Sequence, residues 1–188
     1  EVVRMIGLDN IPAESLPHDN FPKQTLTPAQ RRAVTVKHEL ADRGMLETVT
    51  WSFTDSNIAQ YFRRSEDVVL LMNPIAADLN EMRPSVLPNL LLGAKNNIAR
   101  GYGNVSLFEV GPEFYGRKPG QQTLIAGGVR VGMTSKNHWS GEARALDVFD
   151  VKADASAAIA AATGCTEILS SGTQRRVAPG QKCSGLFR

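Results

Sequence analysis

The sequence predicts an α+β domain in which an antiparallel β-sheet is flanked by helices. One observation is that residues 28–43 and 84–98 carry apolar side chains at helical spacing, each followed closely by a glycine. The other is that strand-like segments follow one another late in the chain, at 104–111 and 123–132, with no helix between them. Consecutive strands of this kind pair as antiparallel neighbours, and the helices then pack on the sheet from outside.

The composition is that of an ordinary globular protein. Of 188 residues, 42% are hydrophobic and 21% are charged, and the length suffices for one domain with a sizeable core. A net charge of +2 is too small to indicate nucleic-acid binding by itself. Cys165 and Cys183 lack the spacing of a metal site and fit a reducing compartment. Without an apolar run of the ~18 residues that a membrane span needs, or a signal-peptide pattern, we expect a cytoplasmic protein with no membrane contact.

Three parts are expected along the chain. Residues 1–7 indicate the last turn of a helix ended by Gly7, which we interpret as the end of a preceding helical domain. Residues 8–27 contain three prolines among Asp and Asn residues, which predicts an extended linker. Residues 28–188 form the main module. Because the chain starts without Met and stops at GLFR with no closing turn, we expect an excerpt that is truncated at its C-terminus.

The first long helix is expected to begin at Pro28, because Thr27 is a suitable N-cap and proline is favoured at the first helical position. Its apolar face consists of Ala29, Ala33, Val36 and Leu40. Its cations fall largely elsewhere and predict a solvated face; they are Arg31, Arg32, Lys37 and Arg43. Alternation over 46–53 predicts a strand. Asp55 is expected to cap a short helix that runs through Phe62. The continuous apolar run at 67–74 predicts a fully buried strand.

The next helix is expected to open at Pro84, with Pro88 one turn in and Gly101 as its end. In the strands that follow, Gly111-Pro112 predicts a break, and Gly127-Gly128 predicts a bulge or a close backbone approach. Residues 133–147 are polar and predict irregular structure, whereas 148–163 predict an alanine-rich helix ended by Gly164. The remainder, 165–188, predicts a strand, a turn and a further strand.

The residues predict no catalytic chemistry. No P-loop, GxGxxG, CxxC or HExxH motif occurs. The three histidines, His18, His38 and His138, are scattered through the predicted linker, helix and loop. Asp147 and Asp150 lie three residues apart at a helix start, where capping and the helix dipole account for them. We therefore expect neither catalytic nor substrate-binding residues in this chain.

An ordered set of segments resembles the β subunit of bacterial phenylalanyl-tRNA synthetase. The segments are EVVRMIGLDNIP, RRAVTVKHELADRGMLETVTWSF, VVLLMNPIAADLNEMRPSVLPNLL, LFEVGPEF, DVFDVK and VAPGQKCS, and they span nearly the whole chain. The resemblance implies a non-catalytic module with the class II aminoacyl-tRNA synthetase fold. It also implies a partner, the catalytic α subunit, in an (αβ)2 heterotetramer that uses ATP and Mg²⁺ to charge tRNA-Phe.

The resemblance also assigns roles to particular residues. A catalytic class II strand carries an Arg two residues before a Glu to grip the ATP α-phosphate, whereas Leu107 stands two residues before Glu109 here. Glu1 matches one carboxylate of a Mg²⁺ site shared with the α subunit, although the chain alone is expected to hold no metal or ATP. The expected subunit interface consists of Arg83, Leu87, Leu90, Leu91, Ala94 and Ile98. Arg83 is also expected to pair with Glu81 or Glu109.

Two other interpretations stay open at this point. One is a free-standing ligase with the class II fold, related to biotin or lipoate attachment, for which GGVRVG at 127–132 is the faint candidate for a nucleotide loop. The other is a general RNA-binding module that uses the cations of residues 31–43. Activity of the isolated chain in ATP–pyrophosphate exchange would favour the ligase.

Overall fold

The computed structural model describes residues 1–15, 25–64, 68–135, 139 and 141–164. The α+β class is confirmed. The helices are α1 (Val2–Ile6), α2 (Pro28–Asp42), α3 (Ser56–Ala59), α4 (Leu87–Ala99) and α5 (Val148–Thr163), with a 3₁₀ turn η1 (Leu8–Asn10). The strands are β1 (Leu46–Glu47), β2 (Phe53–Thr54), β3 (Glu81–Met82), β4 (Val105–Phe114) and β5 (Gln122–Val131). The predictions for 165–188, His18 and His138 fall outside the described residues.

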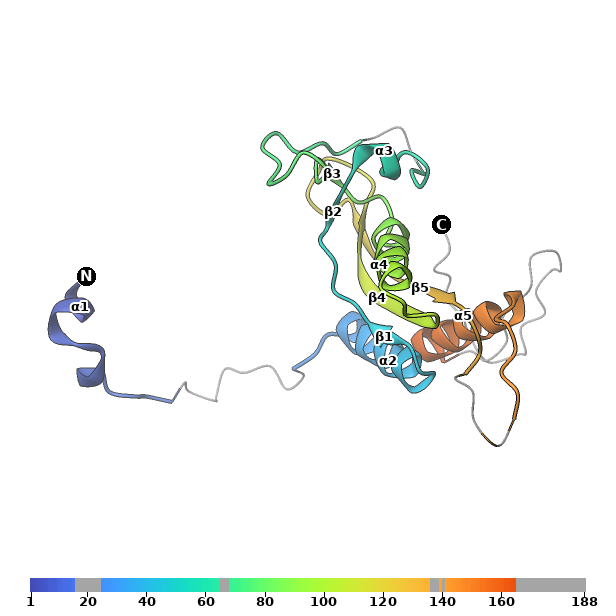
Figure 1. The fold of residues 1–188 in the computed structure, drawn as a ribbon. Coiled ribbons are helices and arrows are strands. Elements are labelled where there is room, and N and C mark those ends of the chain that lie inside the picture. The colour runs from blue at the N-terminus through green and yellow to red at the C-terminus, as the bar shows by residue number, and fades with distance from the viewer. Residues whose placement is uncertain (16–24, 65–67, 136–138, 140, 165–188) are drawn as a thin grey trace, which may run out of the picture.

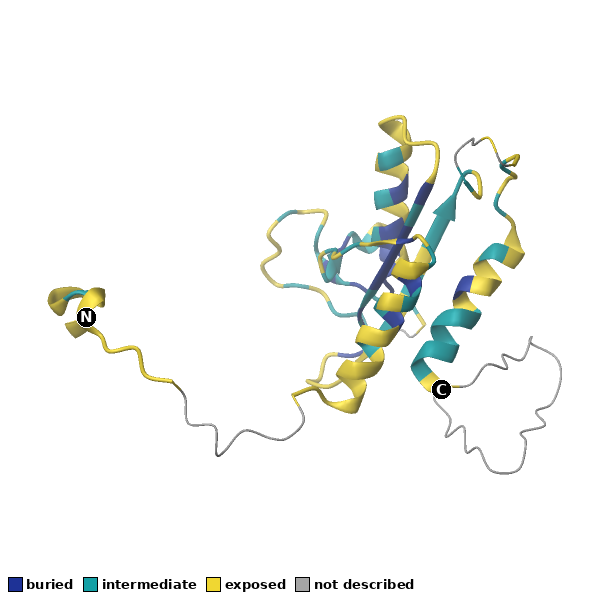
Figure 2. Cartoon of the chain, turned by 90° about the horizontal axis from the view of Figure 1, so that it is seen from below, coloured by how far each residue is buried: buried dark blue, intermediate teal, exposed yellow. Residues whose placement is uncertain are grey.

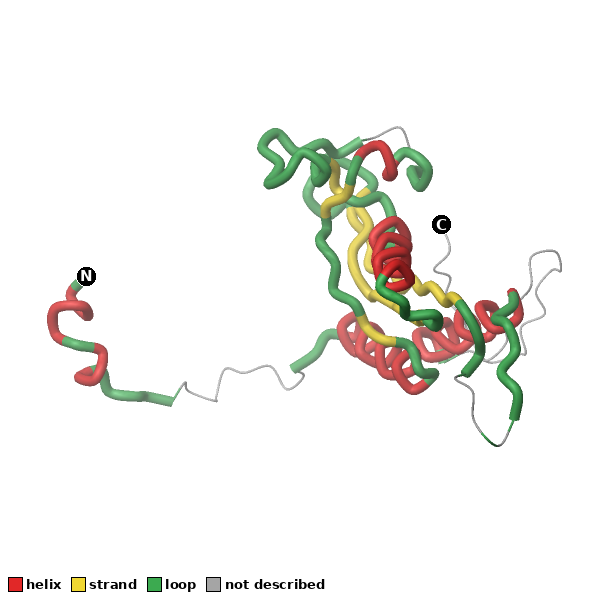
Figure 3. Tube along the Cα trace, in the orientation of Figure 1, coloured by secondary structure: helices red, strands yellow, loops and turns green. Residues whose placement is uncertain are grey.

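The main sheet has the order β1-β4-β5, and β2 and β3 form a separate antiparallel pair (Figure 3). β4 and β5 pair antiparallel over their full lengths, as predicted. The expectation of a wholly antiparallel sheet is wrong at β1, which pairs parallel with β4. The reason is that the chain between these strands includes α4, and a crossover of that kind brings the second strand back in the same direction.

Helices cover both faces of the main sheet (Figure 1). On one face, Val86, Leu90 and Ala94 form a core with Val105 and Leu107 of β4. On the other face, α2 and the end of α5 pack around Phe108, which is fully buried. Figure 2 shows that the buried residues concentrate along β4 and the helix surfaces turned toward it. β4 is therefore the centre of the fold, and alternation along it decides which helix each side chain meets.

Two of the long helices begin and end as predicted. Thr27 caps α2 in a capping box with Gln30, and Pro28 occupies the first turn. Asp147 and Asp150 form the equivalent box at the start of α5, which ends at Gly164 in the left-handed conformation (φ 70°). No helix in the described part of the chain is long and apolar enough to cross a membrane.

Two predicted boundaries are wrong. α4 begins at Leu87 rather than at Pro84, so that Pro88 stands in the first turn, where no N–H is needed. β4 continues through Gly111-Pro112 to Phe114. Proline is tolerated there because the N–H groups of the even residues of β4 face away from β5, as the bond from Phe114 N to Arg83 O shows.

Two predicted strands are only partly formed. Residues 46–53 form β1 and the start of β2 only. Between these two strands, hydrogen bonds from α4 and from the residues just before it take the place of pairing with another strand. Asn89 Nδ2 donates to the carbonyl of Trp51 at 2.7 Å, and Arg83 N donates to that of Ser52 at 2.9 Å. The run at 67–74, expected to be a buried strand, contributes an isolated bridge between Leu70 and Glu81 and leaves Met72 exposed.

Candidate functional site

The six residues predicted for the subunit interface divide into two groups. Arg83, Leu90 and Ala94 are buried within the chain's own fold, with 1%, 1% and 3% of their surfaces exposed. These three side chains cannot reach a partner without unfolding the core. Leu87, Leu91 and Ile98 are exposed by 37%, 47% and 45%, and they remain candidates for contact with another protein.

The exposed group forms one line along α4. A helix turns about 100° per residue, which places Leu87, Leu91 and Ile98 within roughly 40° of one another around the axis. These three residues are called the α4 stripe below. Leu92 is as exposed as Leu91, but it lies roughly 100° away around the helix. The α4 stripe lies beside the buried face of α4. Because that face packs on β4, it fixes the position of the helix and so of the stripe.

A buried ion pair holds the approach to α4 against the sheet. Arg83 Nη1 lies 2.7 Å from Glu109 Oε1, and both side chains are almost fully buried. Of the two partners expected for Arg83, Glu109 is thus the one that the structure shows. Glu81 instead receives two hydrogen bonds from Arg63, Nε to Oε1 at 3.0 Å and Nη2 to Oε2 at 2.5 Å. Glu81 and Glu109 therefore each have their own guanidinium.

Further hydrogen bonds extend this pair into a network. Thr50 Oγ1 donates to Glu109 Oε2 at 2.6 Å and accepts from Arg83 Nη1 at 2.9 Å. Arg83 Nε donates to the carbonyl of Pro112 at 2.9 Å. The network leaves no room at Gly111, where an added Cβ would lie 2.3 Å from Arg83 Nη2. The network thus connects three segments through hydrogen bonds: the residues after β1, the residues just before α4, and the middle of β4.

Leu107 has a packing role. It is buried in the core between β4 and α4, beside Leu90. A side chain at this position faces helix α4 rather than an open surface, so an arginine here could not reach a nucleotide in solvent. The comparison of residue 107 with the phosphate-binding Arg of a catalytic class II strand stays an expectation of the resemblance.

A second charged cluster was not anticipated from the sequence. Asp154 of α5 accepts from Arg43 Nε at 2.7 Å and from Arg130 Nε at 2.5 Å. Burial alone would raise the pKa of Asp154, but hydrogen bonds from Arg130 and Arg43 outweigh it and lower the pKa. The interpretation of Arg43 as a solvated cation is therefore wrong. The available signal was a lone aspartate on the otherwise apolar face of an alanine-rich helix.

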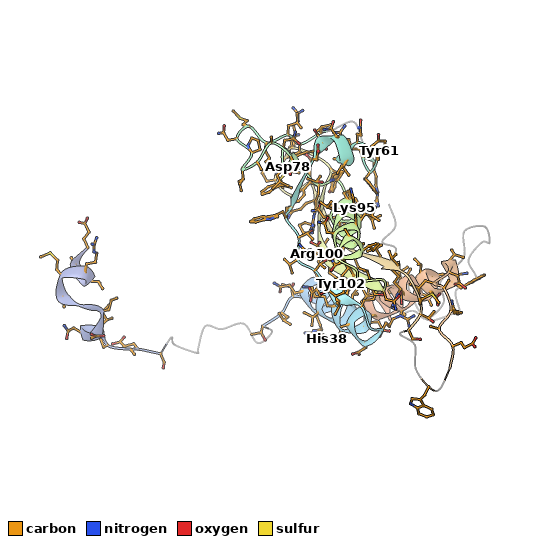
Figure 4. All side chains as sticks on the ribbon, viewed as in Figure 1. His38, Tyr61, Asp78, Lys95, Arg100 and Tyr102 are labelled. Atoms are coloured by element: carbon orange, nitrogen blue, oxygen red, sulfur yellow. The ribbon has the colours of Figure 1, made fainter. Side chains whose placement is uncertain are left out.

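Another cluster of charges lies at the surface, where Arg144 is 2.7 Å from Asp150 and 3.4 Å from Asp147. His38 lies on α2, Tyr61 follows α3, and Lys95 and Arg100 lie on α4 and at its end (Figure 4). Glu1 is exposed at the start of α1. Within the described ranges, no group of three or more His, Cys, Asp or Glu side chains could hold a metal ion.

The fold is that of a class II aminoacyl-tRNA synthetase. A histidine–tRNA ligase subunit from Alicyclobacillus acidocaldarius superposes with a TM-score of 0.51 at 18% identity, covering 81% of this chain and 43% of that one. At this identity the likeness shows the fold alone. The family model described as phenylalanyl tRNA synthetase beta chain CLM domain matches residues 11–184, and the chain belongs to this family.

Curated relatives agree with this assignment. A phenylalanine–tRNA ligase β subunit from Rhodospirillum rubrum is 55% identical over 90% of this chain. One from Paramagnetospirillum magneticum is 51% identical over 86% of it. The chain spans only about a fifth of these relatives, 21% and 20% of their lengths.

Proposed function

We propose that this chain is a non-catalytic scaffold module of the β subunit of phenylalanine–tRNA ligase. It would pack on the catalytic α subunit in a cytoplasmic (αβ)2 enzyme that attaches phenylalanine to tRNA-Phe using ATP. Residues 1–7 would end a preceding helical domain, residues 8–27 would link it to the module, and residues 28–188 would contribute the class II fold. Membership of the β chain family supports the proposal.

The single observation that carries the scaffold role is the α4 stripe on a rigid support. Leu87, Leu91 and Ile98 present apolar surface to solvent, while Leu90 fixes the neighbouring buried face of α4 and the Arg83–Glu109 pair fixes the residues before the helix. Exposed apolar surface on an ordered element is typical of a protein interface. A preorganised interface also loses less conformational entropy on binding.

The described residues offer a poor fit to Mg²⁺. Glu1 is the expected metal ligand, and it belongs to no group of three or more His, Cys, Asp or Glu side chains among the residues that the structure describes. Oxygen ligands in a set of several are what Mg²⁺ requires. We assign ATP and Mg²⁺ to the α subunit or to its boundary with β, and no step of the reaction to this chain.

The alternative of a free-standing ligase has little support from the geometry. Residues 127–131 of GGVRVG form the second half of β5, and Gly127 and Gly128 allow close packing instead of forming a nucleotide loop. A Cβ added at Gly127 would lie 2.4 Å from Val86 Cγ2, and one at Gly128 would lie 2.9 Å from Met45 Cε. The predicted close approach is confirmed, and the paired register shows no bulge.

The alternative of an RNA-binding module loses part of its basis. Of the four cations proposed for it, Arg43 is bound to Asp154 and Lys37 pairs with Glu47 at 2.6 Å. Arg31 and Arg32 stay exposed on α2. Two neighbouring cations are a weak electrostatic footprint for a nucleic acid.

ATP–pyrophosphate exchange tests the non-catalytic role. The full-length β subunit, the α subunit and their mixture would be assayed with phenylalanine. We expect exchange above background in the mixture and none with the β subunit alone. Phenylalanine-dependent exchange by the β subunit alone would contradict the proposal.

A further inference from the structure

A pocket of about 520 Å³ lies between β3, the C-terminal end of β4 and the N-terminal end of β5. Val69, Pro84 and Ile125 contribute apolar walls, and Glu113 contributes a carboxylate. Volumes of about 300–1,000 Å³, apolar walls and a few polar groups are typical of small-molecule sites. Neither the α4 stripe nor the proposed scaffold role involves this pocket.

Glu113 is the feature that the fold leaves unexplained. Its side chain is buried, with 5% of the residue exposed, and Oε1 has no hydrogen-bond partner among the described residues. The other oxygen, Oε2, lies 3.9 Å from Arg64 Nη1, which is too long for a hydrogen bond. A buried carboxylate oxygen without a donor is costly, so the pocket calls for a group that supplies one.

Two of the other three charged residues at the pocket neutralise each other. Arg63 and Glu81 bind each other through two hydrogen bonds, so neither offers an unmet charge to a ligand. The side chain of Arg64 is largely in solvent, with 77% exposed, and its charged contact within the described residues is the long one with Glu113. The unmet demand within the pocket is therefore for a cationic hydrogen-bond donor at Glu113 Oε1.

We propose that this pocket binds a small organic ammonium compound. The ammonium group donates to Glu113 Oε1, and the apolar body lies against Val69, Pro84 and Ile125. An ammonium satisfies the carboxylate with a charge-assisted hydrogen bond, which is stronger than one from a neutral donor. The apolar walls add burial energy in proportion to the area that they cover.

The probe is n-hexylamine, with 1-hexanol and hexanoate as comparators of the same length. The full-length β subunit would be titrated by calorimetry and soaked for crystallography with each compound at millimolar concentration. We expect hexylamine in the pocket with its nitrogen at hydrogen-bond distance from Glu113 Oε1, weaker binding of hexanol, and no binding of hexanoate. Oε1 bonded only to water or to another protein group, with the pocket free of hexylamine, would overturn the proposal.

A matched pair of variants isolates the carboxylate. Glu113→Gln keeps the shape of the side chain but removes its charge, and we expect it to weaken hexylamine binding by about tenfold or more. Glu142→Gln makes the same change at an exposed position outside the pocket and should leave the affinity unchanged. Equal affinities for the two variants would overturn the proposal. If Glu113→Gln does not fold, the wild-type soak decides the question.

Discussion

The guanidinium of Arg83 lies 2.7 Å from the carboxylate of Glu109 in the interior of the protein. Arg83 stands just before α4, and Glu109 lies in the middle of β4. The pair therefore joins the helix that carries the α4 stripe to the central strand of the sheet. Because both charges are removed from water, each depends on the other for its stability in the folded state.

Replacing Arg83 by Met should destabilise the protein strongly. The substitution leaves the Glu109 carboxylate buried and unpaired, which costs about 3–5 kcal/mol of unfolding free energy. Urea unfolding followed by circular dichroism measures this difference. Arg32→Met, at an exposed position on α2, is the control and should change the unfolding free energy by less than about 0.5 kcal/mol.

The double variant Arg83→Met, Glu109→Gln separates the two contributions. Removing both charges avoids an unpaired buried carboxylate, so the double variant should be more stable than Arg83→Met alone. If it were as unstable as the sum of the two single variants, the residues would not interact.

Replacing Gly127 by Ala should also destabilise the protein, for a steric reason. The new methyl group would meet Val86, a fully buried residue in the core beneath α4. Overpacking of this kind costs about 1–3 kcal/mol. Gly103→Ala is the matched control, because nothing lies within 4 Å of the added Cβ. Equal melting temperatures for the two variants would refute the close approach of β5 to α4.

The Asp154 cluster predicts a dependence of stability on pH. The lowered pKa of Asp154 means that its contribution is complete above the unfolded-state pKa of about 3.9 and is lost as the pH falls through the folded-state pKa. Asp154→Asn should cost about 1.5–3 kcal/mol at pH 7, because two guanidinium groups lose a charged acceptor. Unfolding free energies of wild type and variant, measured from pH 7 to pH 2, should converge below pH 4. A difference that stays constant with pH would contradict this account.

The sequence predicted what local chemistry determines. Capping residues located the starts of α2 and α5, and Gly164 located the end of α5. Gly127-Gly128 signalled a close approach, and the structure supplies the neighbours. The sequence could not show which of the predicted interface residues are buried and which are exposed. The apolar residues of 84–98 cover a wide face of the helix, and their spacing does not reveal which part of that face contacts the sheet.

The remaining errors come from tertiary contacts. β1 is parallel to β4 because of a crossover, which periodicity along a single segment cannot show. Arg43 and Asp154 lie 111 residues apart in sequence, so no local pattern joins them. Nothing in the sequence distinguished Glu113 from other glutamates. Only the structure shows that its carboxylate is buried and that Oε1 has no hydrogen-bond donor among the described residues.

The most direct test of the scaffold role is the affinity between the β and α subunits. Leu91→Asp places a charge in the α4 stripe, whereas Leu92→Asp places the same charge at an equally exposed position on another side of α4. We expect Leu91→Asp to raise the dissociation constant by tenfold or more, as for a central interface residue, and Leu92→Asp to change it little. Equal dissociation constants for wild type and Leu91→Asp would contradict docking through α4.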